Sequence, residues 1–353
     1  MSEDLTLIVG GRAISGWTDI TVTRGIERVP GGFSIGLTEL FPGELNDVVV
    51  QPGDACQVKI GIDAVVTGYV DRFIPSISAG RHSVHVTGRG KCQDLVDCAA
   101  EWPNGQISGS SVLEIAKKLS SPYGINASGL DGRAIPQFNL NYGETAWEVI
   151  ERLCRYSAIL PYEIADGSLY LANVGDRLAA SGFIEGQNVL AASIEYSMDQ
   201  RYSEYITTAL SVDTFSELGS GGFFVQTVKD PAVTRNRKRM MVAESGDQGL
   251  DISKLRGVWE MNRRVGHSQV IRLTADSWRD SAGDLWEPNT LVSVSLPKLK
   301  LPDVVWTIGE VTYRRSGAGT TVDVVIMAPG AFSPQPILLF PAFRDIPDFS
   351  KPQ

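Results

Sequence analysis

Alternating hydrophobic and polar residues dominate the chain up to residue 90. Ile20 and Val22, and then Phe33, Ile35 and Leu37, have polar or small neighbours, which is the period of strands with one buried face. The 36 glycines and 18 prolines of the whole chain favour many turns and hence short strands. The pattern predicts about six strands in this part, enough for a small β-barrel or sandwich.

The stretch Thr67–Ala100 marks the end of this first β unit. Residues 67–73 alternate, a polar turn follows, and residues 82–87 alternate again, as in an antiparallel hairpin. From Gln93 onward the apolar residues are spaced for one face of a helix instead. We therefore expect a corner between strand and helix just before Gln93.

Two helices and a hairpin are predicted between residues 100 and 183. Ser111–Glu114 and Thr145–Glu148 are capping boxes, in which a hydroxyl and a carboxylate satisfy backbone N–H groups at a helix start. Apolar residues then recur every three or four positions. Asp166-Gly167, between two alternating runs, is a hairpin turn signal. This part is predicted to be a small α+β domain.

Strand patterns return from residue 184. One helix interrupts them, for which we expect Asp251 as the N-cap and Gly266 as the glycine after the last turn. The stretch 216–222, rich in glycine and serine, is expected to form a hairpin tip. The first and last β blocks are similar in size and strand density, although no sequence repeat links them. The predicted organisation is a first β-barrel domain at 1–99, an α+β domain at 100–183, a second β-barrel domain with one helix at 184–332, and a proline-rich C-terminal tail at 333–353.

Composition indicates a globular protein. Of the 353 residues, 43% are hydrophobic and 21% are charged, unlike disordered chains. The N-terminal segment MSEDLTLIVGG lacks the basic region of a signal peptide, and no stretch approaches the roughly 18 apolar residues of a membrane span. We therefore expect synthesis in the cytoplasm and no membrane insertion. The net charge of −9 argues against tight, nonspecific binding of nucleic acid.

The cysteines and glycine-rich segments predict neither a metal nor a cofactor. Cys56, Cys92, Cys98 and Cys154 form no CxxC pair, and the chain has three histidines, so a zinc site is not expected. Each cysteine lies among apolar residues, which favours a reduced core residue. Gly88–Lys91 departs from the phosphate-binding loop pattern at both ends and is better explained as a turn.

Candidate catalytic residues are few. His82 and His85 fall on opposite faces of one predicted strand, and His267 follows an expected helix end, so none has an evident partner for acid–base chemistry. Carboxylate pairs of the kind glycosidases use stay open, because 41 acidic residues make chance pairs easy. We assign no catalytic residue and predict that the chain is not an enzyme.

Two further features favour structural roles. The basic run Arg235–Arg239 has the composition to bind phosphate or an acidic partner. A strand with one solvated basic face is the favoured interpretation, because the chain is acidic as a whole. Trp286, just ahead of the predicted strand TLVSVSL, is expected to fill a structural position rather than to form a sugar platform.

Eight short motifs follow one another along the chain. They are GWTDITVTRGIE at 16–27, TGYVD at 67–71, TGR at 87–89, DLVDCAA at 94–100, ETAWEVIERLCR at 144–155, DQRYSEY at 199–205, DPAVTRNR at 230–237 and DLWEPNTLVSV at 284–294. Together, and in this order, they resemble the baseplate hub proteins of Mu-like contractile phage tails. One departure is Gly90, where this family usually carries Asp, a side chain that could cap the following helix.

The resemblance implies a mainly β protein with an α+β insert and two similar small β-barrel domains, assembling as a homotrimeric ring. Six similar surfaces around the axis would join a six-fold tail tube to a three-fold central spike. It also implies a structural, non-enzymatic virion protein of the tail baseplate. Its partners would be the spike, the tail tube and other baseplate proteins, with DNA only in transit. Two alternatives stay open: a tail-associated cell-wall hydrolase, and a spike-like hub of a type VI secretion system.

Overall fold

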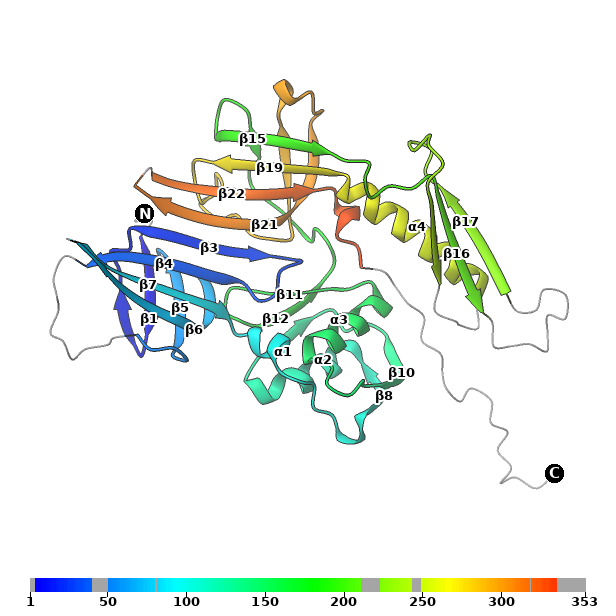
Figure 1. The fold of residues 1–353 in the computed structure, drawn as a ribbon, viewed down its shortest axis with the longest axis horizontal. Helices are drawn as coiled ribbons and strands as arrows, with labels where there is room; N and C mark the ends of the chain where they lie inside the picture. Colours follow the sequence, from blue (N-terminus) through cyan, green and yellow to red (C-terminus); the bar gives the residue numbers. More distant parts are fainter. Residues whose placement is uncertain are drawn as a thin grey trace.

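The protein is mainly β, with an α+β part inserted in the middle of the chain (Figure 1). The predicted hairpin tip at 216–222 and the tail beyond Pro334 lie outside the residues that the structure describes. The computed structural model describes residues 4–39, 50–79, 81–210, 223–242, 249–317 and 319–334.

Seven strands form the first β unit, and the positions that alternate in the sequence are the buried ones. Ile20 and Val22, like Phe33 and Ile35, are less than 5% exposed, because each pair lies on one face of its strand. The strands are β1 (Leu5–Val9), β2 (Arg12–Ile14), β3 (Asp19–Gly25), β4 (Gly32–Glu39), β5 (Ala55–Ile60), β6 (Asp63–Ser78) and β7 (Arg81–Gly90).

The α+β part has a hydrophobic core of its own. Both predicted capping boxes are confirmed: the side chains of Ser111 and Glu114, and those of Thr145 and Glu148, exchange hydrogen bonds with the backbone N–H groups at the starts of two helices. The predicted hairpin is confirmed by β11 and β12. The elements are α1 (Gln93–Asp97), β8 (Gln106–Ser111), α2 (Val112–Ser120), β9 (Ala127–Gly129), β10 (Ala134–Asn139), α3 (Ala146–Ser157), β11 (Leu160–Glu163) and β12 (Leu169–Ala172), with 3₁₀ turns at Pro103–Gly105 and Ser121–Tyr123.

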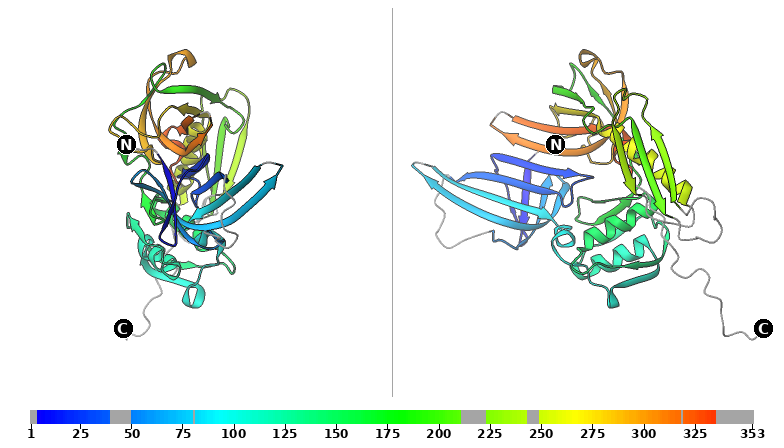
Figure 2. Two further views of the ribbon diagram at one scale, coloured as in Figure 1. Left: turned by 90° about the vertical axis from the view of Figure 1, so that its left-hand side faces the viewer. Right: turned by 45° about the vertical axis from the view of Figure 1, so that its right-hand side comes forward.

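The second β unit follows the α+β part. Its strands contribute to the same hydrophobic core as those of the first unit. Ile26 of the first unit, Tyr162 of the α+β part and Phe332 near the end of the described chain belong to a smaller hydrophobic cluster that joins the three parts. The right-hand view of Figure 2 shows the α+β part below the two β units. The strands are β13 (Arg177–Leu178), β14 (Phe183–Ile184), β15 (Val189–Tyr196), β19 (Gln269–Ala275), β20 (Thr290–Ser295), β21 (Val304–Ser316) and β22 (Gly319–Met327), with 3₁₀ turns at Pro297–Leu299 and Pro329–Ala331.

The segment between β15 and β19 forms a layer of its own. β16 (Glu204–Leu210) pairs with β17 (Phe223–Lys229) and β18 (Lys238–Val242), and α4 (Gly249–His267) packs on this small sheet. The layer projects to one side of the molecule in Figure 1. β15 and β19 nevertheless pair with each other directly. The strand pattern predicted these strands, but not that they leave the main sheet.

Gly266 does not follow the helix but lies inside it, and Asp251 likewise lies inside α4, so both predicted ends were wrong. A Cβ atom on Gly266 would lie 2.5 Å from the backbone nitrogen of Ala331. The glycine therefore allows α4 to approach the Pro329–Ala331 turn closely, a packing reason that a helix-end rule does not contain.

The two β units have the same strand order. It is β3-β4-β7-β6-β5 in the first unit and β15-β19-β22-β21-β20 in the second, and every neighbouring pair is antiparallel. Their irregularities also correspond, since a bulge leaves Asp71 unpaired in β6 and Gly309 unpaired in β21. From the bulge to the hairpin end, at Ser78 and Ser316, the two strands have equal length. The similarity between the two blocks is therefore a shared topology.

Strand pairing joins the two units into one sheet. β3 pairs antiparallel with the second half of β21, from Gly25 opposite Glu310 to Ile20 opposite Arg315. The resulting 14-stranded sheet runs from β15 to β2 and does not close on itself within the described residues. Two separate closed barrels were expected. The pairing differs because the outer edge of β3 is occupied by the other unit.

Candidate functional site

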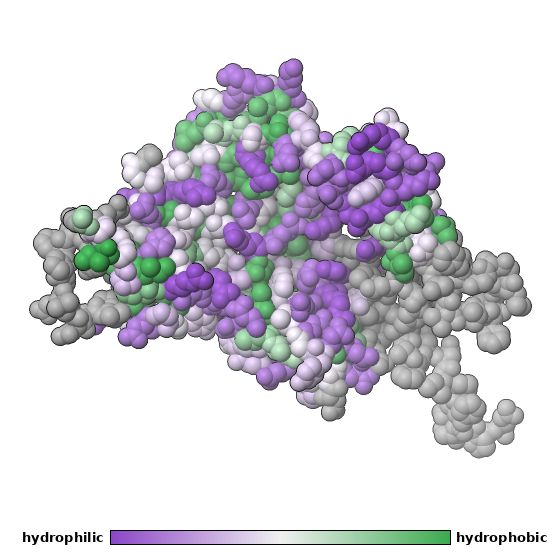
Figure 3. All heavy atoms as spheres, in the orientation of Figure 1, coloured by the Kyte–Doolittle hydropathy of each residue, from purple (hydrophilic) through white to green (hydrophobic). Residues whose placement is uncertain are grey.

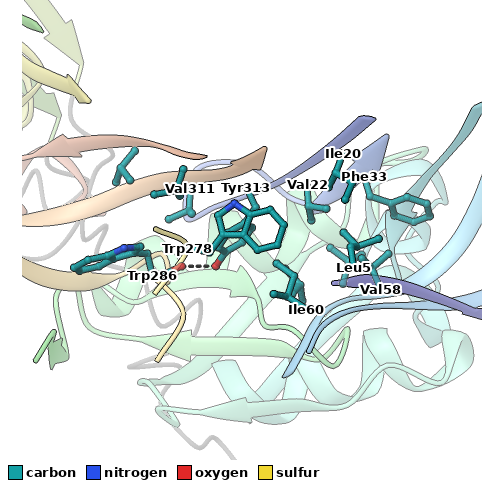
Figure 4. Close-up of a cluster of buried hydrophobic side chains, with 14 of the residues drawn as sticks. Leu5, Ile20, Val22, Phe33, Val58, Ile60, Trp278, Trp286, Val311 and Tyr313 are labelled. Carbon is teal, nitrogen blue, oxygen red and sulfur yellow. Dashed lines mark hydrogen bonds between the residues drawn. The ribbon is translucent and has the colours of Figure 1, made fainter. Parts of the chain in front are cut away.

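The junction between β3 and β21 is the candidate site that the structure defines best. On one face, Val22, Val311 and Tyr313 are fully buried in the core shared by the two units (Figure 4). On the other face, the hydroxyl oxygens of Thr23 and Thr312 lie 3.1 Å apart. The junction thus has one hydrophobic side and one hydroxyl-lined side.

Aromatic side chains fix the hydrophobic side of the junction. The Tyr313 hydroxyl donates a hydrogen bond to the Trp286 carbonyl oxygen (Figure 4). The indole Nε1 of Trp278 donates to the carbonyl oxygens of Arg314 and Thr321, at 3.2 and 2.7 Å. Trp286 is 2% exposed, which confirms the interpretation that it fills a structural position.

A charge cluster also links the two units. Arg24 of β3 is 5% exposed, and its Nη1 lies 3.4 Å from Glu287 Oε1, while Arg177 Nη2 lies 2.5 Å from Glu287 Oε2. Burial alone would raise the pKa of Glu287, but the two guanidinium groups outweigh it and lower the pKa below its ordinary value of 4.5. The cluster therefore holds an ionised carboxylate between the units.

Glu163, at the end of β11, connects the α+β part to the first β unit. Its carboxylate accepts hydrogen bonds from the backbone N–H groups of Gly31, at 2.8 Å, and Cys92, at 2.9 Å. Burial raises the pKa of Glu163, although these N–H groups act in the opposite direction. A Cβ atom on Gly90 would lie 2.1 Å from Glu163 Oε2. Glu163 therefore occupies the space that a side chain at position 90 would take, and it binds the N–H group just ahead of α1.

Two of the sequence motifs meet at the base of the inserted layer. Arg201, from the motif at 199–205, donates hydrogen bonds from Nε and Nη2 to the carboxylate of Asp230, at 2.8 and 2.9 Å. Asp230 belongs to the motif at 230–237, and both side chains are buried. A buried pair with this bidentate geometry joins the segment ahead of β16 to the end of β17, so these motif residues have a structural role within the layer.

The basic run Arg235–Arg239 is not a simple solvated strand face, because β18 begins only at Lys238. The guanidinium carbons of Arg237 and Arg239 lie 5.2 and 5.6 Å from the ring centre of Tyr202. Arg239 also pairs with Glu260 of α4 at 3.0 Å. Of the predicted solvated face, Arg235, Arg237 and Arg239, two of the three arginines thus engage in stacking or ion pairing within the subunit.

Two histidines have partners that the sequence did not reveal. His85 Nε2 lies 2.7 Å from Ser34 Oγ, and His267 Nε2 lies 3.6 Å from the carboxylate of Glu27. Ser34 is the centre of a G-x-S-x-G match at 32–36 that the sequence prediction overlooked. It lies in the middle of β4, not at the sharp turn between strand and helix that a nucleophile elbow requires.

The remaining candidates have packing roles. Gly88–Lys91 lies at the end of β7 just ahead of α1, the predicted corner, and a Cβ on Gly88 would lie 2.3 Å from the Tyr69 carbonyl oxygen. Cys56, Cys92 and Cys154 are buried, and Cys98 is half-buried. Among the described residues, no group of three His, Cys, Asp or Glu side chains is arranged to hold a metal ion. No helix within these residues is long and apolar enough to cross a membrane.

Comparisons with known proteins show the family to which the chain belongs. Family models match residues 4–90 (Mu phage baseplate assembly protein GpP-like, N-terminal), 92–173 (baseplate hub protein gp44-like, second domain) and 250–335 (Mu phage baseplate assembly protein GpP, fourth domain). The baseplate hub protein gp44 of Escherichia phage Mu is 30% identical over 326 residues, covering 88% of this chain and 84% of that protein. The chain belongs to the Mu-type baseplate hub family.

Solved structures of hub-like proteins share the fold. A 43 kDa tail protein of prophage MuSo2 from Shewanella oneidensis is 29% identical, with a TM-score of 0.83 over 94% of this chain and 99% of that one. A tail protein from Neisseria meningitidis is 21% identical, with a TM-score of 0.79 over 95% and 99%. An E. coli component of the type VI secretion system is 11% identical, with a TM-score of 0.57 over 91% and 76%. The hub fold is therefore common to Mu-like tails and to that secretion component.

We predict that Gly90→Asp and Glu163→Ala are each destabilising but partly compensate when combined. The first places a side chain against a buried carboxylate. The second leaves two N–H groups without their partner, at about 1–3 kcal/mol each. In the double variant, Asp at position 90 has room to bind the Cys92 N–H group. Denaturant unfolding of all four proteins should give a favourable coupling of about 1 kcal/mol or more, whereas strictly additive losses would contradict it.

The Glu287 cluster predicts a stability that depends on pH. Because folding lowers the pKa of Glu287, its ionised form stabilises the folded state above pH 4.5, and this contribution disappears as pH falls below that value. Glu287→Gln should lower stability at pH 7 by on the order of 1 kcal/mol and should approach the wild type as pH falls below 4.5. Thermal unfolding across this range measures both. Glu101→Gln, at an exposed position, should leave the pH profile unchanged.

Proposed function

We propose that the chain is the structural hub at the centre of a Mu-like baseplate. In this proposal, three copies form a ring that joins a six-fold tail tube to a three-fold central spike and lets DNA pass. The observation that carries the proposal is the shared strand order of the two β units. Three chains with two like units each supply six similar faces around one axis, which is the number that a six-fold tube needs.

The polar face of the sheet suits the wall of a channel. Short polar and charged side chains lie on the side of the strands away from the core, and several are hydrogen-bonded to one another. The ring would carry 3 × (−9) = −27 formal charges, and an acidic lumen holds DNA away from its walls by repulsion. The paired side chains of this face are Thr23 with Thr312, Ser34 with His85, and Thr274 with Asp323.

The role we propose is non-enzymatic and belongs to the virion tail, after synthesis in the host cytoplasm. The partners are the chain itself, the central spike, and the tail tube or other baseplate proteins, while DNA is met only in transit. The division into domains at 1–99, 100–183 and 184–332, with a tail at 333–353, stays part of this proposal. The likeness to the type VI secretion component supports a shared fold, and a spike-like hub in such a system is the related alternative.

A cell-wall hydrolase carried by the tail is the second candidate, which the contact between Ser34 and His85 favours. Clearing of a peptidoglycan suspension by the purified protein, lost in Ser34→Ala or on substitution of a carboxylate, would establish it. We expect no clearing by the wild-type protein or by the variants.

The size of the purified protein tests the proposed ring. Light scattering should give about 115 kDa, from 3 × 38.2 kDa. The mass should hold on dilution to micromolar concentrations. A monomer of 38.2 kDa under these conditions would contradict the proposed function.

A further inference from the structure

Two hollows between α3 and α4 share Pro334, the last residue that the structure describes. The first has a volume of about 520 Å³ and is lined by the half-buried Trp147 of α3. The second has a volume of about 530 Å³ and is lined by the half-buried Trp259 of α4. Pro334 belongs to the wall of both hollows. The described chain therefore ends in a groove that has a tryptophan in each half.

The first hollow is bounded by all three parts of the subunit. Ile26 comes from the first β unit, Leu160 from the α+β part and Arg263 from α4. Trp147 and Phe332 add aromatic surface to the same wall. A chain segment that lies in this hollow contacts the three parts at once, and burial of apolar side chains there stabilises their arrangement.

The charged side chains that line the first hollow already have partners. Arg263 Nη2 lies 2.8 Å from Glu27 Oε1, and Arg155 Nη2 lies 2.7 Å from Glu151 Oε1. Glu260 pairs with an arginine of its own helix at 2.7 Å. A charged ligand would gain little here, because these side chains neutralise one another. An uncharged, apolar occupant fits the lining without the cost of burying an unpaired charge.

The sequence after Pro334 has this composition. Residues 335–343 read QPILLFPAF and carry no charge, and the first charged side chain is that of Arg344. Proline-rich segments bind in grooves lined by aromatic side chains, in the extended polyproline II conformation. At about 3.1 Å per residue in this conformation, residues 337–340 reach about 9–19 Å from Pro334. This distance is enough to cross a groove between two helices of about 10–12 Å diameter.

The chain that leads up to Pro334 distinguishes the two hollows. Ala328, Gly330 and Ser333 all line the second hollow, next to Trp259. The incoming chain thus already forms part of that wall. The first hollow, next to Trp147, is the one left for the residues that follow.

We propose that residues 336–341 lie in the hollow beside Trp147 of the same chain and strap the α+β part and α4 to the first β unit. The occupant belongs to the same chain because Pro334 lines the hollow. A tether this short gives an effective concentration on the order of millimolar. The contact lies within one subunit and does not depend on the proposed ring. It assigns a role to an apolar sequence beyond the last family match, which ends at residue 335.

Photocrosslinking in the full-length chain locates the segment. The variant Phe340→p-benzoylphenylalanine places a photoreactive side chain in the proposed strap. We expect crosslinks to Trp147, Leu160 or Phe332, mapped by mass spectrometry. Mixing with isotope-labelled wild-type chains distinguishes crosslinks within a chain from those between chains. Phe349→p-benzoylphenylalanine, beyond the strap, is the control and should give only background at these three residues.

Other crosslinking outcomes would overturn the proposal. A competing apolar surface lies on the inserted layer, where Met240 and Val242 of β18 are 76% and 75% exposed. Figure 3 shows hydrophobic residues on this layer, at the right of the view. Crosslinks from position 340 to Met240 or Val242, crosslinks only between chains, or a yield no higher than that of the control would each contradict the strap.

Protease protection tests the contact without a photoreactive group. Arg344 is the one trypsin site in residues 335–353, because Lys351 precedes Pro352. Cleavage at Arg344 releases residues 345–353, which mass spectrometry quantifies. When the strap is bound next to this site, cleavage follows the fraction of molecules in which the strap is released.

A matched pair of variants makes the protease test specific. Leu339→Asp places a charge in the apolar hollow and should speed the release of residues 345–353 by about tenfold. Phe349→Asp adds the same charge beyond the strap and should leave the rate unchanged. Each rate is divided by that of the free peptide 335–353 with the same substitution, which removes direct effects on trypsin. Equal corrected rates for Leu339→Asp and the wild type would overturn the strap.

Discussion

The pairing of β3 with β21 is the interaction on which the rest of the structure depends. It makes one sheet of two units that are far apart in sequence, and it lets their hydrophobic faces share a single core. The buried Arg24 and its partner Glu287 reinforce the same junction from its two sides. Removal of Glu287 would take this partner away from the buried guanidinium group of Arg24, so the pair favours the observed arrangement of the two units.

The two β units are joined at one pair of strand edges, and the equivalent pair of edges has no partner among the described strands. Such an arrangement is suited to assembly. Within a chain, the first strand of one unit covers the long strand of the other. The equivalent edges at the two ends of the sheet remain uncovered among the described strands. Exposed strand edges promote pairing with other chains, and closure into a ring removes them.

Local sequence signals predicted the local structure well. The two capping boxes and the hairpin at Asp166-Gly167 depend on residues within a few positions of one another, so the pattern contained what was needed. The corner at Gly88–Lys91 was predicted for the same reason. The α+β part, with a core of its own, is where these predictions agreed best with the structure.

Features that depend on distant pairings were not accessible from the pattern. The layer formed by β16, β17, β18 and α4 leaves the main sheet because β15 and β19 pair directly, and alternation alone does not say which strands are neighbours. Gly266 was misassigned because its role depends on contact with Ala331. Glu163 was missed because its partners Gly31 and Cys92 come from other parts of the chain. Two barrels were predicted in place of the single sheet for the same reason, because the sheet is joined by β3 and β21, which lie far apart in the sequence.

The most direct test of a ring built from this repeat is an image of the purified protein by electron microscopy. Averages viewed along the axis should show three-fold symmetry, six similar lobes and a central hole, because each subunit contributes two units of like topology. Compact particles the size of one subunit, or open chains without a hole, would contradict the account.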